Sequence, residues 1–295
     1  MDNLKKLKDI LVEFISVVSI HLPDDVYHSL EAMANKEDGR IGNELYGCIF
    51  DNLEKAKTLG RPLCQDTGVL QFFIKAGTKF PYLDELEETI IEATKEATEK
   101  TPLRHNVVEC FTEENTGNNV GTRAPFIEWE IIPHSDELHI DLYLAGGGCS
   151  LPGRSKVLMP LEGYEGIVKY VFDTIVEWGV NACPPLVVGV GIGTCSATAA
   201  LLSKKALLRP VGTHNPNPLA ADMEKRMKKG LDKIGIGPLG LTGKESVQAV
   251  NIEYAAHHPA TLGVGITVGC WATRRGAIDI RSDLSYDIPS HKEAR

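Results

Sequence analysis

Apolar residues near the start of the chain recur at the spacing of an α-helix. Leu4, Leu7, Leu11, Phe14 and Val18 share one face when the chain turns every 3.6 residues. Charged and polar residues fill the positions between them. The pattern therefore predicts a first amphipathic helix.

Two more helices are predicted before residue 60. Pro23-Asp24-Asp25 is a typical helix start, and the apolar residues that follow continue at helical spacing. A third helical pattern, from Ile49 to Ala56, ends near Gly60. We therefore expect a helical N-terminal region over residues 1–60.

Beyond residue 60, short apolar runs alternate with helical patterns. Phe126–Ile132 and Leu138–Leu144 are expected to pair as an antiparallel hairpin. The pattern predicts an α+β fold, with one domain over 1–295 in which mixed sheets flanked by helices form a core over 61–285. The apolar pattern does not predict the order of the strands within the sheets. The predicted strands are 69–74, 126–132, 138–144, 186–193, 262–268 and 277–280, and the predicted helices are 81–100, 164–178, 197–208 and 220–234.

Composition narrows the class of protein. The chain has 295 residues, of which 43% are hydrophobic, so it can bury a sizeable core. Its net charge of -9 argues against a nucleic-acid partner, since such proteins carry basic surfaces. An anionic substrate would therefore need a local arginine or lysine to attract it.

The cysteines and the start of the chain point to a cytoplasmic protein. Seven cysteines occur, and no two stand in C-x-x-C spacing. The first residues lead into a charged helical pattern unlike a signal peptide, and no apolar run is long enough to cross a bilayer. In a reducing cytosol, metal ligation or burial is expected of cysteines more often than disulfides.

The first candidate for chemistry is Leu63-Cys64-Gln65-Asp66-Thr67-Gly68, directly before a predicted strand. Polar clusters at the mouth of a buried strand are common settings for sites. We interpret Cys64 as a metal ligand and Gln65 and Asp66 as substrate groups. On these residues alone, a buried free cysteine beside a turn is an equal alternative.

Three other segments allow both an ordinary and a chemical interpretation. Arg104 lies in a stretch of turn formers. It is either part of an ordinary surface loop or a substrate-binding residue whose guanidinium binds a carboxylate through two hydrogen bonds. Gly146-Gly147-Gly148 is a flexible turn or a backbone that approaches a ligand closely. His257-His258 is a surface pair or a catalytic one.

Cys64, Cys183 and Cys270 share a context, because each stands at one end of an apolar or glycine-rich strand. Three converging thiolates could hold a cubane iron–sulfur cluster and leave its fourth iron without a protein ligand. Such an iron is a Lewis acid for a hydroxy acid. Many unrelated chains contain cysteines at such separations, so spacing leaves the question open.

Four motifs then occur in the order seen in class I iron–sulfur hydro-lyases, the fumarase and tartrate dehydratase family. They are Cys64–Gly68, Asn115–Asn119, Ala182–Pro185 and Gly269–Ala272. The resemblance covers nearly the whole chain. The stretch from Ala145 to Pro160 looks most like the members that dehydrate L(+)-tartrate.

This resemblance implies a [4Fe-4S] cofactor held by Cys64, Cys183 and Cys270. It implies substrate contacts from Gln65, Arg104 and the Gly147 backbone. Asp66 and His258 would be catalytic and manage the proton of the departing hydroxyl. The expected reaction converts L(+)-tartrate to oxaloacetate, with malate and fumarate as the alternative substrates. Of the other cysteines, Cys149 is expected not to bind the cluster, and Cys48, Cys110 and Cys195 are assigned to packing.

The length departs from the single-chain relatives, which continue into a second domain with further arginines, a lysine and a threonine base. This chain stops soon after Cys270. It therefore resembles the large subunit of a split enzyme. We expect a smaller beta subunit that completes the site, in an assembly of two alpha and two beta chains.

Two functions from other classes are alternatives to a hydro-lyase. The first is a nucleotide-binding module at the turn from Gly189 to Ser196, whose G-x-G-x-G spacing departs from the dinucleotide fingerprint. The second is a purely structural subunit whose partner holds all the chemistry. The iron content of the chain separates both from a hydro-lyase.

Overall fold

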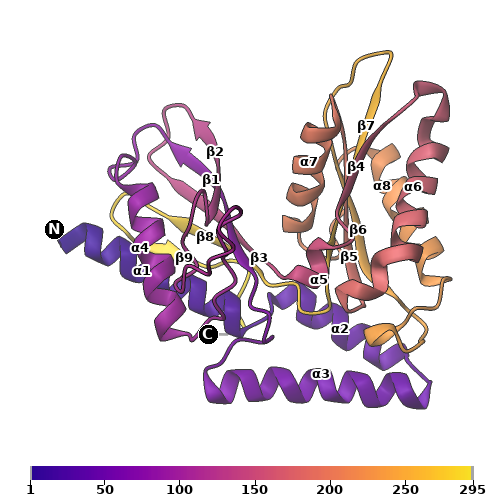
Figure 1. Cartoon of the computed structure of the whole chain (residues 1–295), viewed down its shortest axis with the longest axis horizontal. Helices are drawn as coiled ribbons and strands as arrows, with labels where there is room; N and C mark the ends of the chain where they lie inside the picture. Colours follow the sequence, from indigo (N-terminus) through magenta and orange to yellow (C-terminus); the bar gives the residue numbers. More distant parts are fainter. Residues whose placement is uncertain (1, 294–295) are drawn as a thin grey trace. The chain divides into compact units, whose positions relative to one another are not determined.

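The computed structural model describes residues 2–293, which divide into two compact units (Figure 1). Unit 1 holds the described residues of 1–24, 51–146 and 274–295, and unit 2 holds 25–50 and 147–273. Of the three N-terminal helices, α1 (Asp2–Ile20) belongs to unit 1, α2 (Asp24–Lys36) lies almost wholly in unit 2, and residues of α3 (Arg40–Leu59) belong to both.

Unit 1 is built on a five-stranded sheet in the order β2-β1-β3-β8-β9. Strand β1 pairs in parallel with β2, and the pairs β1–β3, β3–β8 and β8–β9 are antiparallel. The sheet is therefore mixed, as the sequence predicts. Its strands are β1 (Val69–Gly77), β2 (Phe126–Ile132), β3 (Leu138–Ala145), β8 (Arg275–Ile280) and β9 (Tyr286–Asp287).

The predicted hairpin of residues 126–132 and 138–144 is wrong, because β1 lies between β2 and β3. The physical reason is burial. Most residues of β1 are buried, whereas β2 carries Glu128 and Glu130 and none of its residues is fully buried. An apolar strand gains most in the middle of a sheet, and a charged strand suits an edge.

The core of unit 1 forms where α1 and α4 (Leu86–Lys100) cover the sheet. Leu7, Leu11 and Phe14 of α1 are completely buried, as are Phe72 of β1 and Ile90 of α4. The first helix predicted from the apolar spacing is confirmed. Burial of its stripe stabilises the helix more than the propensity of its residues does.

Unit 2 is built on a four-stranded sheet in the order β4-β7-β5-β6. Strand β5 pairs in parallel with β6 and antiparallel with β7, and β7 pairs antiparallel with β4. The strands are β4 (Arg154–Leu158), β5 (Leu186–Gly193), β6 (Val247–Tyr254) and β7 (Leu262–Gly269).

Helix α7 (Ser196–Leu208) packs so closely on this sheet that only glycine fits below it. A Cβ on Gly191 would lie 1.9 Å from the Ala199 carbonyl oxygen, and one on Gly265 would lie 2.4 Å from the same atom. Side chains alternate between the faces of a strand, so the glycines of β5 share the α7 face. The G-x-G-x-G spacing is thus accounted for by helix packing.

The opposite face of the sheet is covered by α6 (Gly163–Trp178) and α8 (Pro218–Asp232), as Figure 1 shows. Val188 and Val190 of β5 pack there against Ile167, Val171 and Leu231. The remaining short elements are α5 (Gly147–Ser150), η1 (Pro160–Glu162), η2 (Gly179–Ala182) and η3 (Pro238–Gly240).

These elements confirm the predicted α+β fold: helices at the N-terminus, followed by mixed sheets with flanking helices. Among residues 2–293, no helix combines the length and the apolar character that a bilayer crossing requires.

Candidate active site

The Cys64–Gly68 turn lies in unit 1, against the end of β3. Gly68 has a φ of +87°, and a Cβ there would lie 2.7 Å from the backbone carbon of Ala145. Only glycine allows this turn to pack so closely. The turn leaves Cys64 partly exposed and Gln65 exposed.

Asp66 is held from two sides. The Asn106 side chain donates a hydrogen bond to Asp66 Oδ1 at 2.9 Å, and the Arg274 guanidinium donates to the Asp66 backbone carbonyl at 2.8 Å. Arg274 is only 2% exposed. A Cβ on Gly146 would lie 2.9 Å from Asp66 Oδ2, so the glycine leaves room for the carboxylate. The side chain is therefore oriented, which acid–base chemistry requires.

Arg104 is anchored beside the same turn by its backbone. Its N–H donates to Thr67 Oγ1 at 3.1 Å, and its carbonyl accepts from Asn119 Nδ2 at 3.0 Å. The Arg104 side chain is exposed and makes no hydrogen bond or ion pair within the described residues. Unit 1 thus brings Gln65, Asp66 and Arg104 together, with a guanidinium available for a carboxylate.

Cys183 and Cys270 are neighbours in unit 2. The Trp271 N–H donates to the Cys183 carbonyl at 3.0 Å, and β5 and β7 pair Val187 with Gly269 just beyond. Cys183 is exposed with a left-handed φ of 51°, and Cys270 is buried. Two cysteines far apart in sequence therefore lie on adjacent backbone segments at one end of the unit 2 sheet.

The glycine loop meets the same end of that sheet. A Cβ on Gly148 would lie 2.7 Å from the Asn181 carbonyl oxygen, two residues before Cys183. Gly147, in the same short helix, is exposed, and Cys149 is buried. Burial lowers the pKa of Lys204 in α7 to about 8, and the charge of Cys149 opposes this change. The backbone predicted to approach substrate is thus near the predicted ligands of unit 2.

His258 lies elsewhere. It is exposed in the loop between β6 and β7, where its Nδ1 accepts from the Ala260 N–H at 3.1 Å. Strand β7 runs from that loop to Cys270, and its eight residues span roughly 25 Å. Unit 2 therefore holds His258 at the opposite end of its sheet from Cys183 and Cys270.

The donor set suits iron–sulfur chemistry, since thiolates are the preferred ligands of such clusters. Unit 2 supplies two cysteines on adjacent backbone segments, and Cys64 belongs to unit 1. Among residues 2–293, no three or more His, Cys, Asp or Glu side chains already form a metal-binding group. The assignment of Cys64, Cys183 and Cys270 as ligands stays a prediction.

The assignment of Cys48, Cys110 and Cys195 to packing is wrong, because all three are exposed. Each stands where a helix surface or loop faces water. A hydrogen bond with Thr198 lowers the pKa of Cys195, at the start of α7.

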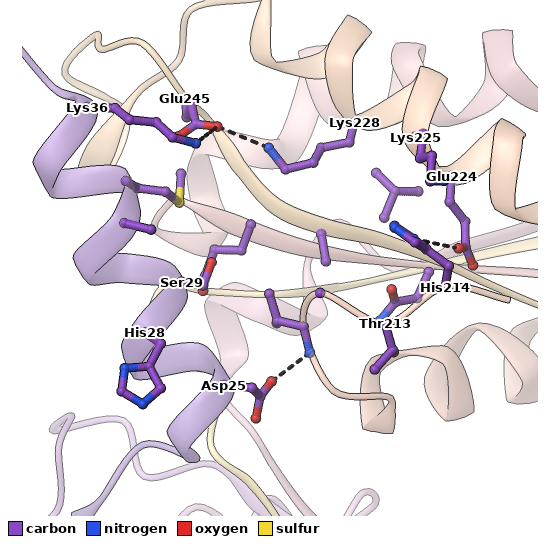
Figure 2. Close-up of a pocket in the computed structure, with 18 residues that line it drawn as sticks. Asp25, His28, Ser29, Lys36, Thr213, His214, Glu224, Lys225, Lys228 and Glu245 are labelled. Carbon is purple, nitrogen blue, oxygen red and sulfur yellow. Dashed lines mark hydrogen bonds and ion pairs between the residues drawn. The ribbon is translucent and has the colours of Figure 1, made fainter.

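Unit 2 also contains a hollow of about 470 Å³ bordered by α2, α8 and β6 (Figure 2). Lys36 and Lys228 reach Glu245 at one end, and Asp25 accepts a hydrogen bond from the Val211 N–H. None of the predicted site residues lines this hollow.

Sequence reasoning did not assign Asn106 or Arg274 to the site, and it used Asn119 only as part of the Asn115–Asn119 motif. Asn106 and Arg274 were visible as polar residues beside the predicted motifs. Their partner, Asp66, is 40 and 208 positions away, so the contacts could not be read from local patterns.

Comparison with known proteins gives concordant matches. The family model described as fumarate hydratase (Fumerase) matches residues 8–279. The L(+)-tartrate dehydratase subunit alpha of Escherichia coli K12 is 52% identical over 288 residues, which cover 98% of this chain and 95% of that protein. A tartrate dehydratase alpha subunit assigned provisionally in Methanocaldococcus jannaschii is 40% identical, covering 94% of this chain and 99% of that one.

Proposed function

Since the chain belongs to the fumarate hydratase (Fumerase) family, we propose that it is the alpha subunit of a hydro-lyase that converts L(+)-tartrate to oxaloacetate. The observation that carries the proposal is the 52% identity, over almost the full length of both chains, to a protein named for that activity. The oriented carboxylate of Asp66 beside an exposed arginine supports it from the structure.

Cys64, Cys183 and Cys270 would hold a [4Fe-4S] cluster. Cys183 and Cys270 fit two of its corners, because their segments are joined by a hydrogen bond at one sheet end. When bound, the cluster supplies a Lewis-acidic iron that weakens the bond to the leaving hydroxyl.

The chain's own residues would bind and orient the substrate. Arg104 is suited to a carboxylate, because its guanidinium is exposed while its backbone is fixed. The exposed Gly147 backbone would approach a second carboxylate or hydroxyl of the substrate, and Gln65 is next to Asp66 in sequence. Asp66 would hold the proton that leaves with the hydroxyl, since Asn106 aims its carboxylate and the adjacent glycine leaves space.

His258 would share this proton handling only in an assembly. Within one chain it is separated from Cys270 by the length of β7. A His258 that serves the same substrate must therefore come from a second copy. This fits the expected assembly of two alpha and two beta chains, in which the smaller subunit supplies the base.

The first experiment replaces Cys64, Cys183 and Cys270 singly with serine in the complex with the smaller subunit, under anaerobic conditions. Each variant is expected to lose the brown chromophore, most of its iron and sulfide, and at least about 1000-fold in activity. Serine at Cys48, which is exposed on α3, serves as the control. Retention of chromophore and activity in all three variants would contradict the proposal.

Fumarate hydration is the second candidate, since the matching family model is described as fumarate hydratase. L(+)-Tartrate and malate, the two hydroxy acids that would be dehydrated, differ by one hydroxyl group. Rates on L(+)-tartrate and on malate, measured with the smaller subunit present, decide between them. Full turnover by the alpha chain alone, after cluster reconstitution, would contradict the need for a partner.

A further inference from the structure

A loop of unit 1, residues 107–116, ends in an aromatic side chain that the described chain leaves uncovered. We call it the anchor loop. Phe111 stands at its tip with a relative exposure of 102%. Burying such a side chain is worth about 1.5–3 kcal/mol. Single exposed apolar residues are common, so exposure alone decides nothing.

Phe111 differs from an ordinary exposed apolar residue because backbone hydrogen bonds within the loop hold its position. The Glu109 N–H donates to the Glu114 carbonyl at 2.9 Å, and the Glu113 N–H returns to the Glu109 carbonyl at 3.0 Å. Lower in the loop, the Thr116 N–H donates to the Val107 carbonyl at 3.1 Å. The loop is thus closed by its own backbone. A preformed loop loses little conformational entropy when a partner binds it.

The charge of the loop indicates the chemistry of its partner. Glu109, Glu113 and Glu114 flank Phe111, and residues 107–116 contain no lysine or arginine. A complementary surface is therefore an apolar socket with basic residues around its rim. A second copy of this chain is a poor occupant, because its net charge of -9 repels an acidic loop.

The base of the loop leads to the proposed active site. Asn106, directly before the loop, is the residue that orients Asp66. Asn115 in the loop donates to the His105 carbonyl at 2.7 Å. A chain that grips Phe111 would therefore lie beside the carboxylate that handles the proton. A subunit that completes this site has to reach the same place.

We propose that Phe111 is the aromatic anchor by which this chain binds its smaller partner subunit, in an apolar socket rimmed by arginine or lysine. The inference rests on the proposed function in one respect, the existence of that subunit. Anchors of this kind are aromatic, central to an interface and surrounded by weaker polar contacts.

The test is Phe111→Ala in the alpha chain, combined with the smaller subunit. The dissociation constant of the hetero-assembly, from analytical ultracentrifugation, is expected to rise at least about 30-fold. Phe111→Trp should restore most of the affinity. Phe111 is in contact with water in the isolated alpha chain. The isolated Phe111→Ala chain should therefore have the same melting temperature and iron content as the wild type.

Leu161→Ala is the matched control, since Leu161 is 99% exposed on unit 2. It should assemble like the wild type. Added salt should weaken the wild-type complex, as an acidic loop in a basic rim requires. In unmodified protein, alkylation of the neighbouring Cys110 should slow at least about tenfold on assembly.

Wild-type affinity in Phe111→Ala, an equal loss in Leu161→Ala, or unchanged Cys110 alkylation would each overturn the anchor. If Phe111→Ala chains no longer associate with each other but still bind the smaller subunit, the smaller subunit is not the partner of Phe111. If the complex forms through Phe111 but does not dehydrate tartrate or malate, the proposed function fails and the anchor stands. If no hetero-assembly forms from wild-type chains, both fail.

Discussion

Asp66 illustrates how a residue becomes a candidate catalyst through its neighbours. An unrestrained carboxylate at the surface has no preferred direction, whereas this one accepts from Asn106 at 2.9 Å. Its backbone is fixed by Arg274. Both contacts come from segments further along the chain, 40 and 208 positions after Asp66. Orientation of Asp66 is thus a property of the folded unit 1.

Asn106→Ala should lower kcat about tenfold or more on the preferred substrate, because Asp66 loses the donor that aims it. KM should change less, since Arg104 remains.

Asn3→Ala is the control, since Asn3 also donates one side-chain hydrogen bond, to Tyr82 at 2.9 Å, on the exposed surface. It should leave kcat and KM unchanged. An Asn106→Ala enzyme with wild-type kcat, or one in which KM changes more than kcat, would contradict the positioning role of Asn106.

At the scale of elements, β3 and β8 are linked by an ionic contact as well as by their ladder. His139 of β3 lies 3.2 Å from Asp141 and 2.7 Å from Asp279 of β8. The Asp141 carboxylate, helped by Asp279 and opposed by burial, raises the pKa of His139 to about 9. The charged imidazole therefore stabilises this pair of strands.

Because the folded pKa of His139 is above its ordinary value of 6.5, its contribution is complete below about pH 6.5 and is lost as the pH rises through 9. We expect the free energy of unfolding to fall by about 1–2 kcal/mol over that window, after allowance for solvent screening. Urea unfolding of wild type and His139→Gln at several pH values measures it. Equal pH dependence in the two proteins would refute the assignment.

The contact between α7 and the unit 2 sheet depends on glycine. Gly191→Ala should destabilise the chain by about 2–3 kcal/mol, because the new Cβ would lie 1.9 Å from a backbone oxygen that cannot move alone. Thermal and urea unfolding measure the loss.

Gly47→Ala is the opposite case and serves as the control. Gly47 lies inside α3, and a Cβ there meets nothing within 4 Å. Alanine should therefore stabilise the helix by about 0.5–1 kcal/mol. A tolerated Gly191→Ala would mean that the helix does not pack on the sheet this closely.

For the whole molecule, the separation of His258 from Cys270 predicts complementation between copies. Cys270→Ser and His258→Ala chains should each be inactive with the smaller subunit. Co-assembled in equal amounts, they should recover about a quarter of wild-type activity, since half of the assemblies are mixed and each has one intact site. No recovery in verified mixed assemblies would show that His258 does not act across copies.

The sequence by itself determined which segments form helices or strands and which types of residue make up the site. Helical spacing predicted α1, and apolar runs predicted the buried strands, because side-chain burial is periodic and local in sequence. The motifs around Cys64, Cys183 and Cys270 indicated the family, which the comparisons confirmed.

Only the tertiary structure decided which elements meet. It placed β1 between β2 and β3, brought Asn106 and Arg274 to Asp66, joined the Cys183 and Cys270 segments, and set His258 at the far end of β7. The physical reason is that strand order and long-range contacts follow from competition for burial among distant segments. A periodic pattern records which face of a segment is buried, but not which segment buries it.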